Sequence, residues 1–290
     1  MRRLRKIAVI GAVAIAAPLL AHAERAGVPD TVTFPSADQK TTLKGYVFRP
    51  AHPGAERLPA VVMMHGRAGA YSQLANGTYD ATTLSKRHKF WGETLAREGY
   101  IAMLVDGFGP RGYPHGFAQH SYGERPPELD ETTVRPLDAY GALAYLRSRP
   151  DVDPKAIALL GWSNGGSATL AAMAADTPAL TDPNPQTGFR GALAFYPACG
   201  LKGKFDDGYL PYAPVRVFIG AADEEVSPKR CEELVEKSEV KGGDIKISVY
   251  PGATHDFDDP GKKRASVDAN AEAVSDALPK VLRFLGESLR

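Results

Sequence analysis

Short apolar runs alternate with longer amphipathic segments along most of the chain. Eight runs have the length and composition of β-strands and span residues 31–34, 42–48, 60–64, 101–105, 157–160, 192–196, 215–219 and 245–250. Five segments carry apolar residues at helical spacing and span residues 86–98, 137–147, 164–175, 228–241 and 267–289. Strands that alternate with helices indicate right-handed crossovers. The pattern therefore predicts an α/β fold with a mainly parallel sheet of about eight strands and helices on both faces.

The first two strand-like runs have no helical segment between them, which predicts an antiparallel hairpin at one edge of the sheet. No internal repeat, block of like charge or long linker divides the remaining sequence. We therefore expect one domain over residues 24–290.

Residues 1–23 differ from this pattern. Arg2, Arg3, Arg5 and Lys6 precede the apolar run IAVIGAVAIAAPLLA, and a small-x-small motif ends at Ala23. This order is typical of a secretory signal peptide. An uncleaved membrane anchor is the alternative, but the run is shorter than the roughly 20 residues that a spanning helix needs. We expect cleavage near Ala23, export to the periplasm or the medium, and no stable membrane span afterwards.

The composition is that of a folded globular protein, with 43% hydrophobic and 24% charged residues among 290. Lys and Arg number 35 against 34 Asp and Glu, a net charge of +1. Residues 1–23 carry four positive and no negative charges, so the remainder has 31 against 34, or −3. This balance disfavours a nucleic-acid partner and leaves a small molecule as the expected ligand. Nothing in the composition predicts the oligomeric state.

A Gly-x-Ser-x-Gly string gives the first chemical signal. The run that ends at residue 160 is followed by GWSNGG at 161–166 and then by a helical segment. Strand, Gly-x-Ser-x-Gly and helix in this order form a nucleophile elbow, in which a tight turn presents the serine at the carboxyl edge of the sheet. Ser163 is therefore the candidate nucleophile, and Trp162 is expected to pack beneath the elbow.

A serine nucleophile needs a base and an acid that orients the base, and the elbow fold supplies them in the order Ser, Asp or Glu, His. His255 is the only histidine beyond Ser163 and follows the run 245–250, so it is the candidate base. Asp223 follows the run 215–219 and is the candidate acid, with Glu224 as its main rival. The alternatives are a solvated turn carboxylate at Asp223 and a structural role for His255.

The reaction also needs N–H donors for an oxyanion. The N–H of Asn164, at the start of the helix, is one candidate; the N–H of Arg67, after the run 60–64, is the other, with Gly66 as its alternative. His65 is expected to be structural rather than catalytic. The Arg67 side chain could meet a substrate carboxylate or lie on the surface.

Taken together, these motifs resemble the α/β-hydrolase superfamily and, within it, the dienelactone hydrolase family. The matching stretches are HG at 65–66, DGFGPRG at 106–112, GWSNGG at 161–166, FYPACG at 195–200, the Asp223 loop and GATHDF at 252–257. The resemblance implies hydrolysis of esters or lactones through an acyl-enzyme, with no cofactor and no metal. Dienelactone hydrolase proper is similar but has a cysteine at the position of Ser163, which favours a general serine carboxylester hydrolase here. A peptidase or acyltransferase with the same triad, and a non-catalytic binding protein, remain alternatives.

Residues 108–136 form a long irregular insertion rich in Gly, Pro and aromatic residues. Such an insertion is typical of a lid or pocket wall, although its aromatics could simply pack it onto the body. Phe108, Tyr113 and Arg111 are the candidate pocket residues. For Arg111, a structural salt bridge is the alternative to binding a substrate carboxylate.

The two cysteines, Cys199 and Cys231, both lie close to the ends of neighbouring strand-like runs. In an oxidising compartment we expect them to form a disulfide, with two buried thiols as the alternative. The acidic cluster after His255 lacks the spacing of metal ligands, and its pair Asp258 and Asp259 is expected to face solvent.

Overall fold

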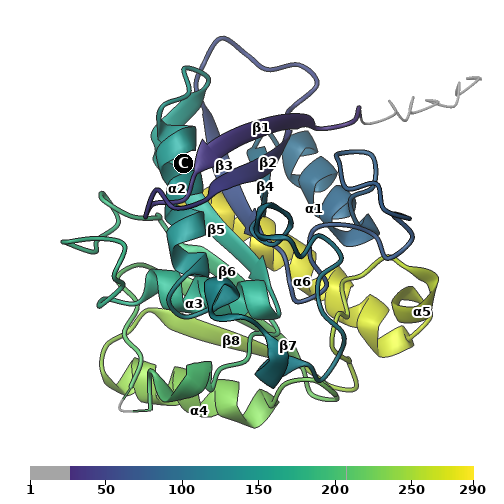
Figure 1. The fold of residues 1–290 in the computed structure, drawn as a ribbon. Helices are drawn as coiled ribbons and strands as arrows, with labels where there is room; N and C mark the ends of the chain where they lie inside the picture. Colours follow the sequence, from purple (N-terminus) through teal and green to yellow (C-terminus); the bar gives the residue numbers. More distant parts are fainter. Residues whose placement is uncertain (1–26, 207) are drawn as a thin grey trace, which may run out of the picture.

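The computed structural model describes residues 27–206 and 208–290. The eight strands of these residues form one sheet in the order β1-β2-β4-β3-β5-β6-β7-β8 (Figure 1). The strands are β1 (Asp30–Pro35), β2 (Thr42–Phe48), β3 (Leu58–Met64), β4 (Ile101–Asp106), β5 (Val152–Trp162), β6 (Ala192–Phe195), β7 (Val215–Gly220) and β8 (Ile245–Tyr250). The six strands from β4 to β8 in this order run parallel, whereas β2 is antiparallel to both β1 and β4. The predicted parallel sheet with an antiparallel hairpin at its edge is confirmed.

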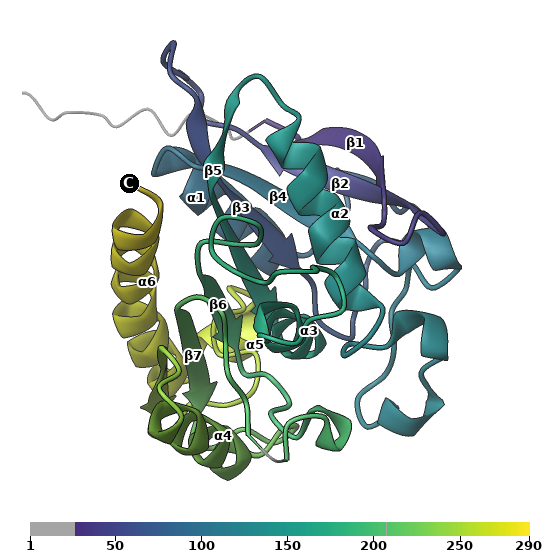
Figure 2. The same ribbon diagram turned by 90° about the vertical axis from the view of Figure 1, so that its left-hand side faces the viewer.

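Helices cover both faces of the sheet (Figures 1 and 2). The α-helices are α1 (Lys86–Arg97), α2 (Arg135–Arg147), α3 (Asn164–Met173), α4 (Pro228–Val240), α5 (Lys262–Ala265) and α6 (Asp268–Leu289). Short 3₁₀ turns are η1 (Gly109–Arg111), η2 (Tyr122–Glu124), η3 (Pro127–Leu129) and η4 (Leu201–Gly203). Helices α2 and α3 lie on one face, and α1 and α6 lie on the other. Strand β4 is buried along its whole length, which explains its uninterrupted apolar sequence.

The order of the strands fixes where a ligand can bind. The chain runs from β3 outwards to β4 and then returns to β5 on the other side of β3, so that β3 and β5 are neighbours. Met64 near the end of β3 pairs with Gly161 near the end of β5. The loops that leave these two strands diverge at a topological switch point, where open α/β sheets form their binding crevice.

Strand β5 is longer than the predicted run 157–160. The sequence VDPK at its beginning contains Pro154, which argues against a central strand because proline cannot donate a ladder hydrogen bond. The structure accommodates the proline at a shift of register, between the pairs Leu58–Val152 and Ala60–Ile157. The extra length is therefore a local irregularity that periodicity does not reveal.

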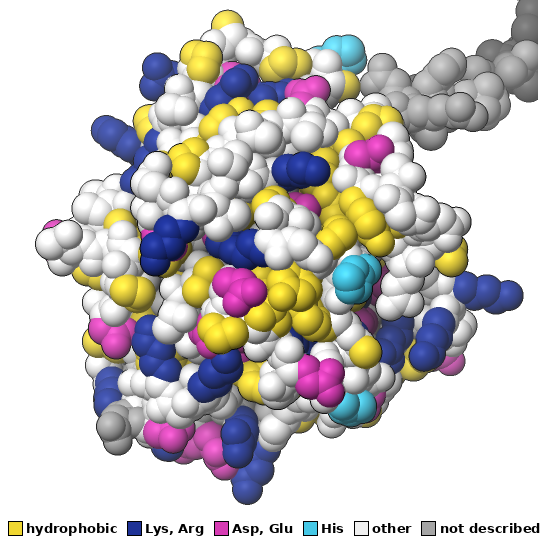
Figure 3. Space-filling view, in the orientation of Figure 1, with side chains coloured by type: hydrophobic (Ala, Val, Ile, Leu, Met, Phe, Trp, Pro, Cys, Tyr) yellow, Lys and Arg dark blue, Asp and Glu magenta, His cyan; other side chains and the backbone are white. Residues whose placement is uncertain are grey.

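The predicted signal peptide, residues 1–23, lies outside the described residues, and so does the predicted domain boundary at residue 24. Across residues 27–206 and 208–290, no helix has both the length and the apolar character required to cross a bilayer. Charged side chains of both signs are interspersed over the face seen in Figure 3, around a hydrophobic area near its centre. This distribution agrees with the nearly balanced charge count of the sequence.

A disulfide joins Cys199 to Cys231, as the sequence predicts. Cys199 lies in the segment after β6, and Cys231 lies in the first turn of α4. Both sulfur-bearing side chains are buried. The bond therefore ties two chain segments that meet at the carboxyl edge of the sheet.

Removing this bond is expected to lower the free energy of unfolding by about 3 to 4 kcal/mol, because it closes a loop with a sequence separation of 32. Urea unfolding of the wild type and of the Cys199→Ser/Cys231→Ser variant measures the difference. Reductant should destabilise the wild type by a similar amount and leave the double variant unchanged. An equal response of both proteins to reductant would contradict the expectation.

Candidate active site

Ser163 occupies a strained turn between β5 and α3. Its φ of 53° and ψ of −118° lie outside the regions that non-glycine residues usually adopt. The turn is possible because its neighbours are glycines: a Cβ on Gly161 would lie 2.2 Å from the Gly165 oxygen, and one on Gly165 would lie 2.1 Å from the Met64 oxygen. The Ser163 N–H is held by the Phe195 oxygen of β6 at 2.9 Å. The elbow predicted from the sequence is thus present.

Ser163, His255 and Asp223 are hydrogen-bonded in series. The Ser163 Oγ lies 3.0 Å from His255 Nε2, and His255 Nδ1 lies 2.8 Å from Asp223 Oδ2. The other oxygen of Asp223 accepts the N–H groups of Glu225 and Val226, both at 2.9 Å. These contacts fix the carboxylate on the loop after β7. A hydroxyl, an imidazole and a carboxylate in this order can activate the hydroxyl for nucleophilic attack.

Glu224, the rival acid, serves a different purpose. Its Oε2 accepts the backbone N–H of His255 at 2.9 Å, and its Oε1 accepts from Arg264 at 2.6 Å. Glu224 therefore holds the backbone of the His255 loop and does not hydrogen-bond to the imidazole ring. Of the two candidates, Asp223 is the one whose carboxylate contacts the imidazole.

Opposing effects act on the pKa of His255. Burial alone would lower it, because only 1% of the side chain is exposed. The hydrogen bond to Asp223 and the negative charges of Asp256, Asp223 and Glu225 outweigh burial and raise the pKa of His255 above its usual 6.5. The protonated form of the ring is thereby stabilised.

The two residues proposed to supply N–H donors, Asn164 and Arg67, line the same cavity as Ser163. Asn164 is the first residue of α3, and Arg67 lies in the loop after β3. In the described ranges, neither N–H has a hydrogen-bond acceptor. The loop after β3 passes close to the nucleophile, because a Cβ on Gly66 would lie 3.9 Å from the Ser163 Oγ. The arrangement leaves both donors available to a bound group.

His65 is structural. It is fully buried, its Nδ1–H donates to the Gly66 oxygen at 2.8 Å, and its Nε2 accepts the Gly107 N–H at 3.3 Å. Burial and the nearby Arg135 charge hold the pKa of His65 well below its usual value. The ring is therefore neutral and serves to connect the loops after β3 and β4.

Arg135, at the start of α2, was not predicted as part of the site. Its guanidinium donates to the His65 carbonyl at 2.8 Å and to the Asn164 side-chain oxygen. Burial lowers the pKa of Arg135 to about 10, so the group stays cationic at neutral pH. Arg135 thus joins the loop after β3 to the beginning of α3. No sequence motif contains it, and only its complete burial marks it.

A cavity of about 870 Å³ opens beside Ser163. Ser163, Asn164 and Ser167 line it on one side, and the segments 198–206 and 225–237 line it on the others. Cys199 of the disulfide is part of this wall. The cavity is large enough for a small organic substrate.

The predicted pocket residues were wrong: among the described residues that line the cavity, Phe108, Arg111 and Tyr113 are absent. Phe108 is fully buried and packs edge-on against His65 at 4.5 Å between ring centroids. Arg111 forms a bidentate ion pair with buried Asp138, at 2.7 and 2.8 Å. Tyr113 packs against Phe117 at 5.3 Å between ring centroids.

The insertion contributes other residues to the cavity instead. His120, Tyr122 and Arg125 line it, whereas in the first part Phe108 packs against His65 and the Phe117 N–H donates to the Arg67 oxygen at 2.8 Å. Both interpretations of the insertion therefore apply, each to a different half. Aromatic content alone could not separate the two halves.

The Arg67 side chain also bears on the site. It forms a bidentate ion pair with Glu225, at 2.7 and 2.6 Å, and donates to the Phe117 oxygen at 3.2 Å. The Arg67 guanidinium is thus held by a carboxylate of the protein. It connects the loop after β3 to the loop after β7 and to the insertion.

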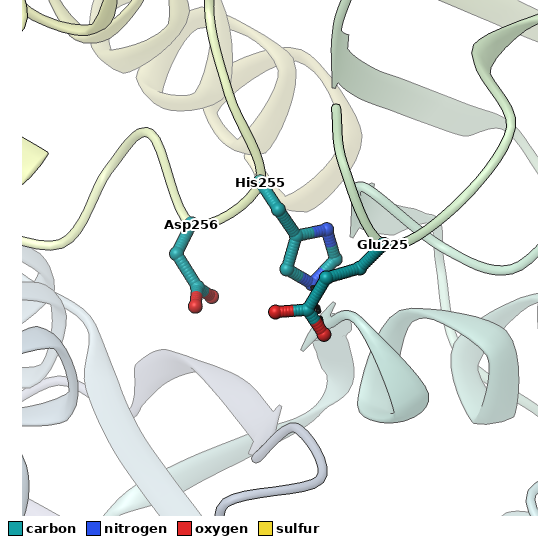
Figure 4. Close-up of side chains that lie close together, drawn as sticks. All are labelled: Glu225, His255 and Asp256. Atoms are coloured by element: carbon teal, nitrogen blue, oxygen red, sulfur yellow. Dashed lines mark ion pairs between the residues drawn. The ribbon is translucent and has the colours of Figure 1, made fainter. Parts of the chain in front are cut away.

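Glu225, His255 and Asp256 lie close enough together for their nitrogen and oxygen atoms to fall within 4.8 Å of one another (Figure 4). Each already has a partner of its own. Glu225 pairs with Arg67, Asp256 pairs with Arg87 at 2.6 Å, and the Nε2 of His255 faces Ser163. A cation here would have to displace two ion pairs, so the donor set does not fit a metal site.

The expectation that Asp258 and Asp259 face solvent was wrong for Asp258. Its side chain is 1% exposed, whereas that of Asp259 is 33% exposed. Both tryptophans of the chain, Trp91 and Trp162, donate to the same oxygen of Asp258, at 2.7 and 2.8 Å. A buried indole N–H needs a hydrogen-bond acceptor. The two tryptophans therefore indicated that some acceptor side chain is buried, a signal that the prediction from residue spacing did not include.

Comparison with known proteins identifies the family of the chain. The model of the dienelactone hydrolase family matches residues 43–289. The chain belongs to the dienelactone hydrolase family, a hydrolase family of the α/β-hydrolase superfamily.

Individual relatives are distant. A Synechocystis sp. protein provisionally named carboxymethylenebutenolidase is 24% identical over 268 residues, 89% of this chain and 96% of the relative. The quorum-quenching protein AidA of Acinetobacter baumannii is 29% identical over 177 residues, 60% of this chain and 50% of AidA. Thermogutta terrifontis esterase 2 has a similar fold, with a TM-score of 0.62 at 18% identity, covering 91% of this chain and 97% of the esterase.

The ion pair of Arg111 generates a stability prediction. Arg111→Met should lower the free energy of unfolding by about 3 kcal/mol, because it leaves the buried charge of Asp138 without its partner. Urea denaturation measures the loss, and Arg111→Met/Asp138→Leu should recover much of it. A raised KM without a loss of stability would instead indicate that Arg111 binds substrate.

Proposed function

We propose that this protein is an exported serine hydrolase that cleaves carboxylic esters or lactones. The observation that carries the proposal is the hydrogen-bonded series Ser163–His255–Asp223 beside a cavity of about 870 Å³. Membership of a hydrolase family with esterase relatives supports it.

In the first half of the reaction, Ser163 attacks the carbonyl carbon of the substrate while His255 Nε2 takes the hydroxyl proton. Asp223 orients the ring and stabilises the imidazolium that forms. The tetrahedral oxyanion accepts hydrogen bonds from the N–H groups of Asn164 and Arg67. His255 then protonates the leaving alcohol, and the acyl group stays on Ser163.

In the second half, a water molecule replaces the alcohol. His255 removes a proton from the water, the resulting hydroxide attacks the acyl carbon, and the same two N–H groups hold the second oxyanion. His255 returns the proton to Ser163 Oγ, and the acid is released. For a lactone, the leaving alcohol is part of the same product.

The disulfide supports export, since such bonds persist in oxidising compartments. The basic and apolar order of residues 1–23 supports the same conclusion. We therefore propose a signal peptide over residues 1–23 and a catalytic domain over 24–290.

Ser163→Ala tests the nucleophile. A fluorophosphonate probe should label the wild type once and leave Ser163→Ala unlabelled, and turnover of p-nitrophenyl esters should fall at least about 10³-fold. Ser167→Ala is the matched control, because Ser167 also lines the cavity but contacts the Ser163 carbonyl rather than a base. Labelling that persists in folded Ser163→Ala would refute the assignment.

The same protein should be compared on esters, lactones and peptide anilides. The proposal expects esters or lactones to be the better substrates by kcat/KM. Faster cleavage of anilides would indicate a peptidase, and transfer to added alcohol in preference to water would indicate an acyltransferase.

The pKa of His255 generates a pH prediction. The base must be neutral to accept a proton, so kcat/KM should rise with pH through a value above 6.5 and then level off. Asp256→Asn removes a charge that raises this pKa, and the rise should move to lower pH. Asparagine suits the position, because Asp256 has a φ of 59°.

Asp259→Asn is the control for this shift. Asp259 also faces Arg87, at 3.4 Å, but is not among the main charges acting on His255. An unmoved profile in Asp256→Asn, or an equal shift in both variants, would contradict the prediction.

A further inference from the structure

The buried carboxylate of Asp258 is the feature that the mechanism leaves unused. Its side chain is 1% exposed and accepts hydrogen bonds from Trp91, Trp162 and Tyr196, and the Nε of Arg87 forms an ion pair with it at 3.4 Å. Burying a carboxylate costs several kcal/mol unless hydrogen bonds replace the lost water. The hydrogen bonds to Asp258 also fix the side chains that donate them.

One oxygen of Asp258 reaches the nucleophile side of the site. Its Oδ2 accepts from Trp162 Nε1 at 2.8 Å, and Trp162 is the last residue of β5, directly before Ser163. The indole is fully buried. The bond therefore fixes the end of the strand from which the elbow begins.

The other oxygen reaches the base. Its Oδ1 accepts from the Tyr196 hydroxyl, and the Tyr196 ring lies 4.6 Å from the His255 ring, centroid to centroid. Tyr196 follows β6 with an unusual φ of 37° and is fully buried. Asp258 also stands three residues after His255 on the same loop. Asp258 is thus linked to His255 in two ways, by the backbone of the shared loop and by the Tyr196 side chain.

The sheet explains why such a link is needed. Ser163 follows β5 and His255 follows β8, and β6 and β7 lie between these strands. Strands are spaced by about 4.8 Å, so the two strand ends lie roughly 14 Å apart. The loop after β8 must therefore cross two strand ends to bring its imidazole to Ser163, and no ladder hydrogen bond between β5 and β8 can hold it there.

Arg87 of α1 balances the charge of this loop. Its guanidinium lies 2.6 Å from Asp256 and 3.4 Å from both Asp258 and Asp259. Three carboxylates of one loop thereby share one buried cation. Arg87 keeps the loop against α1, whereas Asp258 connects it to the ends of β5 and β6.

We propose that Asp258 is a positioning residue that sets the contact between Ser163 Oγ and His255 Nε2. It acts through Trp162 on the serine and through Tyr196 on the imidazole, and touches neither substrate nor the reacting atoms. This inference rests on the proposed function, because it assigns a role within the same serine–histidine pair.

The two tryptophans allow a matched test. Both donate to the same oxygen of Asp258, but Trp162 adjoins Ser163 whereas Trp91 belongs to α1. Trp→Phe removes one N–H and a similar volume at each position. Substituting Asp258 itself would leave three donors without their acceptor, so the donors are the better targets.

Trp162→Phe should lower kcat and the rate of fluorophosphonate labelling by about 10- to 100-fold, with KM within about twofold of the wild type. Trp91→Phe should lose thermal stability but keep kcat within about threefold. The proposal is overturned if both folded variants lose kcat to the same extent, because the hydrogen bonds would then only stabilise the core.

A second pair of variants removes only a hydroxyl. Tyr196→Phe keeps the ring against His255 and should lower kcat by about tenfold without raising KM. Tyr209→Phe is its control, because Tyr209 is equally buried but donates to the Leu170 carbonyl. Equal kcat in both variants would refute the link through Tyr196.

Failure of the proposed function would appear differently. If the folded wild type neither hydrolyses esters nor reacts with the probe, the proposed serine hydrolase function is refuted. If the wild type is reactive but Trp162→Phe and Tyr196→Phe have the same kcat as their control variants, only the role of Asp258 is refuted.

Discussion

The hydrogen bond between Ser163 and His255 joins two loops that the sheet itself keeps apart. Their strands are not neighbours, so backbone pairing cannot hold the loops together, and side chains must do so. Most of the unusual features near the carboxyl edge meet this requirement. Glu224 holds the backbone of His255, Arg87 gathers three carboxylates of its loop, and Asp258 contacts the ends of β5 and β6.

Several buried charged groups near the site are held by partners from other segments of the chain. Arg67 pairs with Glu225 across the loops after β3 and β7, and Arg111 pairs with Asp138 of α2. Arg135 bridges the His65 carbonyl and the Asn164 side chain. In a medium of low polarity such pairs cost more to break than to keep, so the loops that carry them stay in one arrangement.

Sequence reasoning located the sheet, the hairpin, the elbow and the disulfide because each depends on local pattern or on position at a strand end. Ser163, Asp223 and His255 were predicted in this way, and the structure brings their side chains into contact. The cavity walls were not predicted, because whether Phe108 or Tyr122 faces a cavity depends on packing between distant segments. The prediction that Asp258 faces solvent was wrong for a related reason. An aspartate in a loop is usually exposed, and the two tryptophans that donate to Asp258 lie 167 and 96 residues away in the sequence.

The network around Asp258 also bears on how the molecule opens. Local unfolding of a loop requires its hydrogen bonds to break, and segments that share partners break them together as one cooperative unit. The loop after β8 shares its bonds with the end of β5, the end of β6 and helix α1. It cannot fray alone. Amide exchange in these segments is therefore expected to follow a common sub-global opening.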